Sequence, residues 1–282
     1  MYQITTKRRL HDTVTLMEIS APLVAGKAQP GQFVILRIDE NGERIPLTIA
    51  DYSAEKGTIT IIFQKVGATT NRLDAMNQGD YLQDFVGPLG NPSELEGKAG
   101  KKIAVIGGGL GIAIAYPQAK ALHKAGADVD IIVGFRSTEL FILVDELQSA
   151  CNNLIVMTDD GSNGNKGFVT TALENQIKAE VKYDEVIAIG PLPMMRAVCN
   201  LTKEQNIPTV VSMNPIMIDG TGMCGGCRLT VGGETKFACV DGPDFDGHLV
   251  DFDEAIARSR MYKKEENLST ERHACNLTKG VN

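Results

Sequence analysis

The chain has 282 residues, of which 43% are hydrophobic and 22% charged, so it is long enough for about two domains with sizeable cores. Its 35 acidic residues outnumber its 28 basic ones, which gives a net charge of -7. This balance disfavours a nucleic acid or an anionic membrane as partner, because either would reward an excess of lysine and arginine.

The distribution of apolar residues and cysteines predicts a cytoplasmic protein. No apolar run follows the basic residues 7–9, so no signal peptide is expected. The longest apolar stretch, residues 103–119, is broken by glycines and a proline and is shorter than the roughly 20 residues that cross a membrane. Six cysteines are too few for a disulfide scaffold in a chain this long, and three of them lie close together. That pattern indicates metal binding in a reducing compartment.

The first hundred residues have the pattern of an all-β domain, which we place at residues 1–97. Runs rich in β-branched residues alternate with turn-forming pairs, such as Pro-Gly at 30–31 and Asn-Gly at 41–42. Short strands at this spacing predict a small barrel, and a helix is expected only at residues 70–76. The predicted strands are Thr13–Ile19, Gln32–Ile38 and Thr58–Gln64.

After a polar linker at residues 91–102, apolar strands alternate with helices. This alternation predicts a doubly wound, parallel α/β sheet with right-handed crossovers, which we place at residues 98–213. The predicted strands are Ile103–Ile106, Asp128–Val133, Leu154–Thr158, Glu185–Ile189 and Thr209–Ser212. The predicted helices are Ile112–Ala125, Thr138–Ala150, Thr170–Ala179 and Met194–Gln205.

Residues 214–282 form the third predicted unit. The part up to residue 250 is rich in glycine and cysteine, is too short for a core of its own, and is expected to be held by a metal centre. A short helix is predicted at Phe252–Tyr262, followed by a polar, mobile tail at Lys263–Asn282.

Glycines follow the first α/β strand where the next helix begins. Such glycines let the backbone approach a pyrophosphate, and the helix N-terminus offers N–H groups to its charge. Ile112 stands where the G-x-G-x-x-G fingerprint has its last glycine, and any tight βα turn also uses glycine. At the first strand of an α/β domain, the loop nevertheless favours a nucleotide. Its residues are Gly107, Gly108, Gly109, Leu110 and Gly111.

Three further loops follow strand ends, where ligands bind in open parallel sheets. Arg136 ends the second strand, where an adenosine ribose would lie, and suits either a 2′-phosphate or a solvated helix start. Asp160 follows the third strand, and Gly190 with Pro191 follows the fourth; each also suits a simple turn. The residues alone leave the choice between NAD and NADP open.

Two barrel segments offer anion-binding chemistry without being specific for it. Arg44 provides a cation beside an extended segment, and the turn at residues 67–70 opens a helix. Both segments are also ordinary strand and helix-start sequences.

The most specific motif is a cysteine loop with the spacing D-x4-C-x2-C-x11-C. It has the plant-type order of a [2Fe–2S] site with aspartate in place of the first cysteine, and glycines around the thiolates suit a soft metal. A structural zinc site usually offers a second pair of ligands, so zinc is the alternative, and the aspartate also suits a turn residue that caps the loop. The predicted ligands are Asp219, Cys224, Cys227 and Cys239. Cys151 and Cys199 are expected in the core, and Cys275 exposed in the tail.

Barrel, dinucleotide domain and cysteine loop, in this order, resemble the ferredoxin–NADP reductase-like family over residues 1–262. Within it, the chain is similar to the small subunits of NADH-dependent ferredoxin:NADP oxidoreductases and of sulfide dehydrogenases, and to electron-transfer subunits of dihydroorotate dehydrogenases. The dihydroorotate relatives have four cysteines in the loop, whereas Asp219 is shared with the first group and favours it. The segment at residues 86–90, Val-Gly-Pro-Leu-Gly, also matches a family signature.

The resemblance implies which residues bind the cofactors. The family's R-x-[YPIL]-[ST] segment, which binds FAD, maps to Ile45, Pro46, Leu47 and Thr48, with Arg44 one residue before the arginine's usual place. Residues 107–112 correspond to the nicotinamide-nucleotide loop. Further flavin and pyrophosphate contacts are implied at Ile62, Phe63, Gln64, Gly67, Thr69 and Thr70.

The implied function is electron transfer between NAD(H), FAD and a [2Fe–2S] cluster in an oxidoreductase subunit. The implied partner is a larger subunit with a second FAD and [4Fe–4S] clusters, which bifurcates electrons and gives access to ferredoxin and NADP(H). The alternatives are a subunit serving dihydroorotate or sulfide oxidation and, less favoured, a non-enzymatic domain with structural zinc. No catalytic acid–base pair is predicted.

Overall fold

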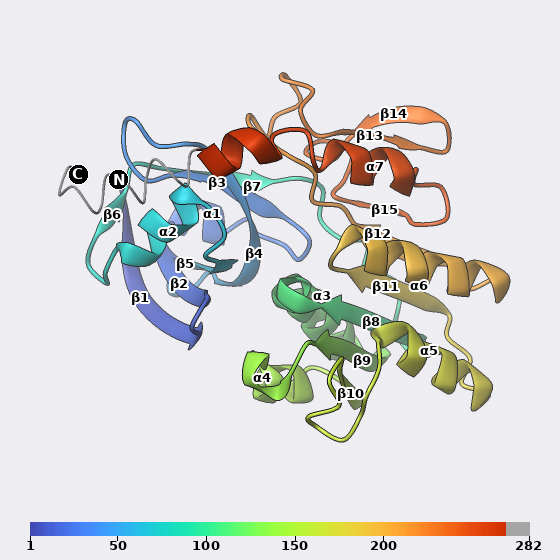
Figure 1. The fold of residues 1–282 in the computed structure, drawn as a ribbon. Coiled ribbons are helices and arrows are strands. Elements are labelled where there is room, and N and C mark those ends of the chain that lie inside the picture. The colour runs from blue at the N-terminus through green and yellow to red at the C-terminus, as the bar shows by residue number, and fades with distance from the viewer. Residues whose placement is uncertain (269–282) are drawn as a thin grey trace.

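Figure 1 shows a computed structural model of the protein, in which residues 1–268 are described. The N-terminal part is one antiparallel sheet in the strand order β6-β1-β2-β5-β4-β3-β7, curled into a nearly closed barrel, as predicted. Helix α1 (Pro22–Ala25) and helix α2 (Ala68–Ala75) are its only helices within these residues. Its strands are β1 Tyr2–His11, β2 Val14–Ser20, β3 Phe33–Arg37, β4 Ile45–Ser53, β5 Thr58–Gln64, β6 Tyr81–Leu82 and β7 Asp84–Leu89.

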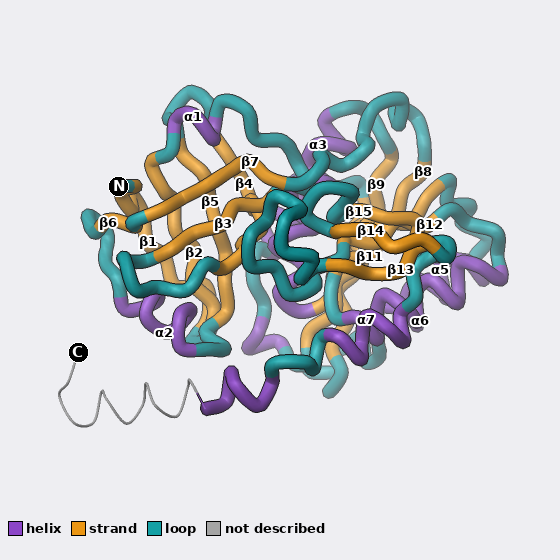
Figure 2. The backbone as a smooth tube through the Cα atoms, turned by 90° about the horizontal axis from the view of Figure 1, so that it is seen from above, coloured by secondary structure: helices purple, strands orange, loops and turns teal. Residues whose placement is uncertain are grey.

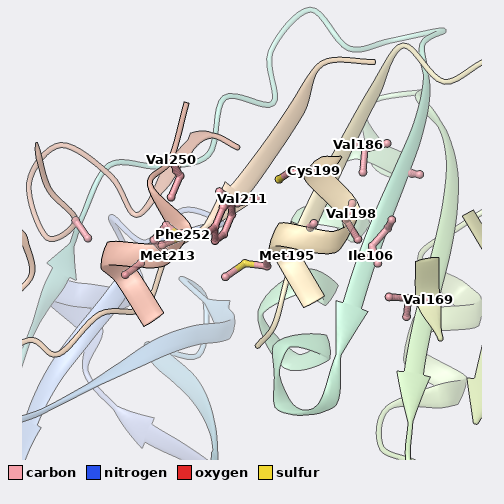
Figure 3. Packing of buried hydrophobic residues seen from close by; sticks show 14 of the residues in the cluster. Ile106, Val169, Val186, Met195, Val198, Cys199, Val211, Met213, Val250 and Phe252 are labelled. Carbon is pink, nitrogen blue, oxygen red and sulfur yellow. The ribbon is translucent and has the colours of Figure 1, made fainter. Parts of the chain in front are cut away.

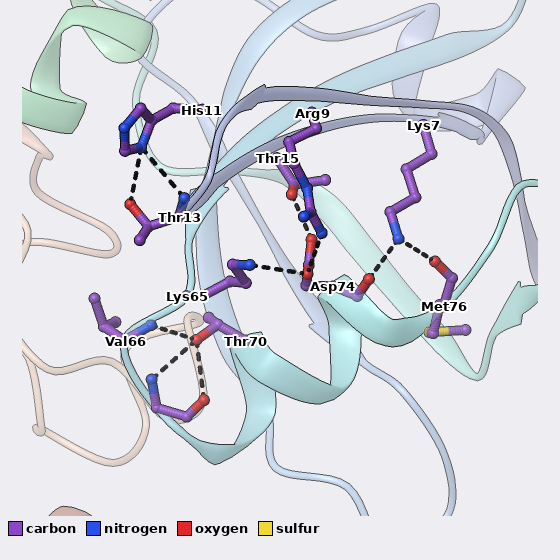
Figure 4. Close-up of polar contacts among 11 residues, drawn as sticks. Lys7, Arg9, His11, Thr13, Thr15, Lys65, Val66, Thr70, Asp74 and Met76 are labelled. Carbon is purple, nitrogen blue, oxygen red and sulfur yellow. Dashed lines mark hydrogen bonds and ion pairs between the residues drawn. The ribbon is translucent and has the colours of Figure 1, made fainter. Parts of the chain in front are cut away.

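Of the seven barrel strands, the predicted ranges correspond to β2, β3 and β5. Strand β1 was missed because its polar residues obscure the alternation. Only Ile4 of its ten residues is fully buried. Two of its basic residues reach across the barrel end to α2: Lys7 Nζ donates to Met76 O at 2.8 Å, and Arg9 pairs with Asp74 at 3.1 Å (Figure 4). Tertiary contacts to α2 thus replace the hydrophobic pattern that marks β2, β3 and β5.

The α/β part is a six-stranded sheet in the order β10-β9-β8-β11-β12-β15. The predicted doubly wound parallel sheet is confirmed, and its five parallel strands match the predicted ones within two residues at each end. They are β8 Lys102–Gly108, β9 Asp128–Phe135, β10 Asn153–Thr158, β11 Glu185–Ile189 and β12 Thr209–Ser212. The helices are α3 Ile112–Lys124, α4 Val144–Ser149, α5 Val169–Lys178 and α6 Leu192–Glu204, with 3-10 turns at Gly109–Gly111 and Thr138–Leu140.

Helices cover both faces of this sheet because alternate strand residues point in opposite directions. In β8, Ile103 and Val105 pack with α3 and α4, whereas Ala104 and Ile106 pack with α5 and α6. Figure 3 shows the second cluster, in which Ile106 lies beside α6 residues. The expected core positions of Cys151 and Cys199 are confirmed, since both are buried.

The single helix predicted over Thr138–Ala150 is wrong. A 3-10 turn at Thr138–Leu140 and helix α4 are separated at Leu143, whose φ of 57° lies in the left-handed region. Ile142 and Leu143 turn into the cluster under α3, and burying them outweighs helical continuity.

The sixth strand, β15 (Asp244–Asp246), comes from the C-terminal segment and pairs antiparallel with β12. The same segment forms the hairpin β13 (Arg228–Val231) and β14 (Glu234–Phe237), and then α7 (Phe252–Arg258). Its apolar residues join one cluster with the sheet and with Phe33 and Ile35 of the barrel. Apolar packing against the sheet and the barrel therefore helps to hold this segment in place, in addition to the predicted metal centre. Figure 2 shows its loops between β3 and the hairpin.

The end of the chain differs in part from the prediction. Helix α7 ends at Arg258 rather than at Tyr262, and residues 263–268 are helical. The remainder of the predicted tail, with Cys275, lies outside the described residues. Within residues 1–268, no helix has the length and apolar character needed to span a bilayer.

The turn from β8 into α3 depends on the close approach of Gly111 to β11. A Cβ atom at Gly111 would lie 2.4 Å from Ile189 O and 2.8 Å from Gly190 Cα, whereas one at Gly109 would meet nothing within 4 Å. Gly109 instead has a φ of +56°, which is strained for any other residue.

We therefore expect Gly111→Ala to lower the free energy of unfolding by about 2–3 kcal/mol, because backbone must move. Gly109→Ala, the matched control, should lower it by about 1 kcal/mol through backbone strain alone. Urea unfolding of the two variants measures both values, and equal losses would contradict the close approach.

Asp74 gives the barrel a pH-dependent contribution to stability. Burial alone raises the pKa of this carboxyl, but hydrogen bonds from Thr15 and Lys65, with the charges of Lys65 and Lys7, outweigh it and lower the pKa. A lowered pKa in the folded state means that the contribution is present above the usual pKa of a carboxyl and is lost as pH falls through the folded-state pKa.

Asp74→Asn should accordingly cost about 2 kcal/mol at neutral pH, and the difference from wild type should shrink on acidification. Thermal unfolding across acidic and neutral pH checks this. Asp12→Asn, at an exposed turn residue, is the control; a difference for Asp74→Asn that does not vary with pH would refute the assignment.

Candidate cofactor sites

The strand order creates a crevice at the carboxyl ends of β8 and β11. From β8 the chain continues to β9 and β10 on one side, whereas β11 and β12 lie on the other. Ligands of open α/β sheets bind where the order reverses in this way. The structure brings two predicted loops together there, because a Cβ at Gly190 would lie 3.1 Å from both N and O of Gly108.

Most glycines of the nucleotide loop have packing roles. A Cβ at Gly107 would lie 2.9 Å from the Ile112 side chain, and one at Gly108 would lie 2.4 Å from Met194 Sδ. Ile112, which replaces the last glycine of the fingerprint, is the first residue of α3 and is fully buried. Gly109 alone faces open space, and Leu110 beside it is half-buried. The 13-residue helix α3 begins here and directs its N-terminal N–H groups toward the crevice.

The loops after β9 and β10 are joined to each other. Asp160 N donates to Arg136 O at 3.2 Å, and the Asp160 carboxylate accepts from Ser162 N at 2.9 Å. These Ser162 hydrogen bonds lower the pKa of Asp160, so this carboxylate stabilises its own turn. The Arg136 side chain is exposed and makes no hydrogen bond or ion pair with the rest of residues 1–268. Its guanidinium is therefore available to a ligand at this strand end.

The predicted flavin residues of the barrel occupy different environments. Residues 45–48 form the start of β4, pair with β3 and are half-buried. In β5, Phe63 lies in the barrel core, Ile62 packs with the α/β cluster that includes α3, and Gln64 is exposed. The side chain of Phe63 therefore points away from any ligand outside the barrel.

The hydroxyls at the start of α2 are engaged within the protein. Thr70 Oγ1 accepts from Val66 N at 3.0 Å and from Gly67 N at 3.1 Å (Figure 4). Thr69 Oγ1 donates to the carboxylate of Glu43. These contacts shape the turn, and the exposed surface it offers a ligand is mainly backbone around Gly67.

Arg44 lies against the cysteine loop. Its Nε donates to Ile218 O at 3.3 Å and its Nη2 donates to Asp219 O at 3.4 Å. The guanidinium therefore links the start of β4 to the loop. Arg258 of α7 provides a second link through Nη2 to Gly226 O at 3.1 Å. Sequence reasoning missed Arg258, because a single arginine in an amphipathic helix carries no distinguishing signal.

Asp219 shapes the loop in which it stands. Its Oδ2 accepts from Thr221 N at 2.9 Å, Thr221 Oγ1 at 2.7 Å and Met223 N at 3.1 Å. These bonds, first those from Thr221, lower the pKa of the carboxyl. Asp219 thus caps the turn of the loop in the structure, as one of the two interpretations of the sequence predicts. Its role as a metal ligand stays a prediction.

The three cysteines differ in burial. Cys227 and Cys239 are 2% and 3% exposed, and they lie together: burial, followed by the hydrogen bond and charge of Cys227, raises the pKa of Cys239 to about 12. Cys224 is exposed, and its Sγ accepts from Gly226 N at 3.4 Å, which lowers the pKa of that thiol.

The donor set fits a soft metal centre in its chemistry. Two adjacent thiols, a third thiol of lowered pKa and a backbone N–H aimed at sulfur are features that suit an iron–sulfur site. Across residues 1–268, however, no three His, Cys, Asp or Glu side chains are gathered closely enough to hold a metal ion. A cavity of about 460 Å³ opens beside Cys224, between the loop and α7.

Comparison with known proteins identifies the cysteine segment and the whole chain. Residues 214–251 match the model of the iron–sulfur cluster binding domain of dihydroorotate dehydrogenase B. The chain is 46% identical to the dihydroorotate dehydrogenase B (NAD(+)) electron transfer subunit homolog of Thermotoga maritima, over 96% of this chain and 94% of that one. It is 34% identical to the electron transfer subunit itself from Bacillus caldolyticus, over 86% and 94% of the two chains.

A solved structure of an NADH-dependent reduced ferredoxin-NADP oxidoreductase, described in terms of flavin-based electron bifurcation, is also similar. It is 45% identical with a TM-score of 0.91, and the match covers 96% of this chain and 97% of that one. Phthalate dioxygenase reductase, at 17% identity and a TM-score of 0.58, shares the fold. The predicted family resemblance and the oxidoreductase class are confirmed. The chain belongs to the family of dihydroorotate dehydrogenase B electron-transfer subunits and their homologues.

Proposed function

We propose that this chain is the electron-transfer subunit of a bifurcating NADH-dependent ferredoxin:NADP oxidoreductase. The observation that carries the proposal is the end-to-end similarity to the structure of that enzyme, at 45% identity and a TM-score of 0.91. Identity to the Bacillus caldolyticus dihydroorotate subunit is lower, at 34%. Aspartate at position 219, where the dihydroorotate relatives have cysteine, supports the same choice.

The proposed cofactors are FAD on the barrel, NAD(H) over the α/β sheet and a [2Fe–2S] cluster in the C-terminal segment. When bound, the flavin would exchange hydride with nicotinamide and single electrons with the cluster. It connects the two because nicotinamide transfers two electrons at once, whereas the cluster takes one at a time. The protein's part is to position these groups. No residue within 1–268 is proposed as a catalytic acid or base.

NAD(H) is proposed to lie in the crevice between β8 and β11. The N–H groups at the start of α3 would hold its pyrophosphate, and Gly190 with Pro191 would border the nicotinamide side. Arg136, whose side chain has no partner within residues 1–268, would contact the adenosine ribose or its phosphate. Asp160 is the weaker candidate, because its carboxylate is engaged by Ser162.

FAD is proposed to lie along the outer face of the barrel. Residues 45–48 of β4 and the exposed end of β5 at Gln64 would flank the flavin, and the turn at Gly67–Thr70 would receive the pyrophosphate through its backbone N–H groups. Arg44 would act indirectly, since its guanidinium holds the cluster loop.

The cluster is proposed to be bound by Cys224, Cys227, Cys239 and Asp219. The adjacent buried pair, Cys227 and Cys239, provides a fixed base, while Cys224 lies on an exposed, glycine-rich turn that can adjust. Arg44 and Arg258 hold carbonyls on either side of that turn. Their positive charges would raise the reduction potential of a nearby cluster, because they favour its more negative, reduced form.

A larger subunit is proposed to dock over the cluster loop. Several apolar side chains are exposed on the loop and the following helix turn, with Met223 at 83% exposure; such groups mark interaction surfaces. That subunit would carry a second FAD and [4Fe–4S] clusters and would give access to ferredoxin and NADP(H). The other exposed residues are Ile218, Val240, Met261 and Tyr262.

The alternative is the electron-transfer subunit of an NAD-linked dihydroorotate dehydrogenase. The match of residues 214–251 to the cluster domain of that enzyme and the names of the relatives favour it. The two functions share the three cofactors and differ in the partner subunit and its substrate.

Purification of the native complex distinguishes these functions. We expect it to contain a larger flavo-iron–sulfur subunit and to reduce ferredoxin and NAD⁺ together when NADPH is supplied. The isolated chain, reconstituted with FAD, should reduce a dye with NADH. NAD⁺ reduction dependent on dihydroorotate, without NADPH-dependent ferredoxin reduction, would establish the alternative instead.

Substitution of the ligands tests the cluster site. Cys227→Ser should lose most of its iron and the EPR signal of the dithionite-reduced protein, whereas Asp219→Cys should keep the iron and change the signal, because a thiolate replaces an oxygen ligand. Cys151→Ala, at a buried cysteine outside the loop, is the control and should keep both.

Metal analysis and EPR spectroscopy of anaerobically purified protein provide the readouts. Stoichiometric zinc in a colourless wild-type protein would reject the cluster. An unchanged EPR signal in Asp219→Cys would exclude Asp219 as a ligand.

A further inference from the structure

A buried polar cluster joins the three parts of the molecule away from the proposed cofactor sites. It contains Asp244 of β15, Gln118 of α3 and Ser93 of the linker that follows the barrel. Gln118 is fully buried, and the Oδ1 atom of Asp244 is shielded from solvent, although the residue as a whole is half-buried. This cluster is independent of the proposed function.

The hydrogen bonds of this cluster leave two oxygen atoms without partners. Ser93 Oγ donates to Asp244 Oδ2 at 2.6 Å, and Gln118 Nε2 donates to the same oxygen at 3.4 Å. The other oxygens of the two facing groups, Asp244 Oδ1 and Gln118 Oε1, are buried and have no hydrogen-bond partner. If Asp244 is ionised, both atoms are acceptors, and neither can satisfy the other. Two such orphaned groups cost free energy in a folded protein.

We propose that Asp244 is a neutral carboxylic acid in the folded protein and that its O–H donates to Gln118 Oε1. The two side chains then form a cyclic acid–amide pair, in which the amide N–H donates to one carboxyl oxygen and the carboxyl O–H donates to the amide oxygen. One proton satisfies both orphaned atoms. The Ser93 hydroxyl remains a donor to Oδ2, as observed.

The charges around the cluster favour the neutral form. No ion pair with Asp244 occurs within residues 1–268, and Glu185 of β11, which lines the adjoining cavity, is paired with Lys98 Nζ. The remaining charged groups that line the adjoining 220 Å³ cavity are all acidic and would repel a second carboxylate. They are Glu94 of the linker and Asp241 and Asp246 of the C-terminal segment.

Burial also raises the pKa of Asp244, although the polar side chains of Ser93, Ser212 and Gln118 oppose the rise. A raised pKa in the folded state means that this group stabilises the protein fully below the usual pKa of a carboxyl. The stabilisation is lost as pH rises through the folded-state pKa.

The pair acts as a positioning contact between cofactor-bearing segments. Gln118 lies in the helix that begins at the nucleotide loop, and Asp244 follows Cys239 by five residues. Ser93 is in the linker, which is also held by the bond from Asn91 N to Gly242 O at 2.7 Å. A single protonated carboxyl thus connects the barrel linker, the α/β sheet and the cysteine segment.

Infrared spectroscopy of the full-length protein with its cofactors tests the proposal directly. At neutral pH we expect the carbonyl band of a protonated carboxylic acid in wild type and its loss in Asp244→Asn. Asp246→Asn, at an exposed acid two residues away on the same strand, is the matched control and should retain the band. Absence of the band in wild type, or its persistence in Asp244→Asn, would overturn the proposal.

Thermal unfolding provides a second readout. The side-chain amide introduced by Asp244→Asn can donate to Gln118 Oε1 at every pH, so the melting temperature of this variant should match wild type at low pH and exceed it increasingly as pH rises. If that variant does not fold, Gln118→Met should shift the wild-type band to higher frequency, because the acid loses its acceptor. A wild-type melting temperature that depends on one particular metal cation would show instead that a cation lies between the two oxygens.

Discussion

The pairing of β15 with β12 is the contact on which the arrangement of the molecule depends. Ser212 pairs with Asp244 and Val210 with Asp246 in an antiparallel register. The three residues of β15, which belong to the C-terminal segment, thus complete a sheet that begins at residue 102. A parallel sheet exposes unpaired backbone groups at its edge, and β15 covers that edge. Because β15 follows the cysteines closely in sequence, the same pairing delivers the cysteine loop to the junction with the barrel.

Burial at this junction compensates for the small size of the C-terminal segment. Cys227, Leu229 and Cys239 lie in one apolar cluster with residues of α6, of β12 and of barrel strand β3. The loop is thus packed from two sides, and Arg44 and Arg258 add polar links from the barrel and from α7. A short segment with many glycines gains from its neighbours the order that it could not obtain alone.

The glycines of the α/β domain show how one residue type serves packing and ligand access together. Gly108, Gly111 and Gly190 allow the loops after β8 and β11 to touch, which no larger residue would permit. This contact closes the floor of the crevice, and the start of α3 with Gly109 remains at its surface. The departure of Ile112 from the fingerprint is consistent with this division, since its side chain fills the core rather than the crevice.

The amino-acid sequence alone was enough to predict the two main folds, their order, the strands and three of the four helices of the α/β domain, and the cysteine motif. These features are local: period-two and helical patterns, turn-forming pairs and motif spacing are all readable along the chain. It did not reveal β1, whose order comes from contacts to α2, or the break at Leu143. It also missed the short strands β6, β7, β13, β14 and β15, the last only three residues long.

Which side chains meet is decided by the packing of the folded chain. The placement of Arg44 on the cysteine loop, the capping role of Asp219 and the burial of Asp244 beside Gln118 each join residues that are distant in sequence or depend on a turn's exact shape. Periodicity specifies the face of an element, whereas a hydrogen bond requires positions within a few tenths of an ångström, and those follow from the packing of the barrel, the sheet and the C-terminal segment against one another.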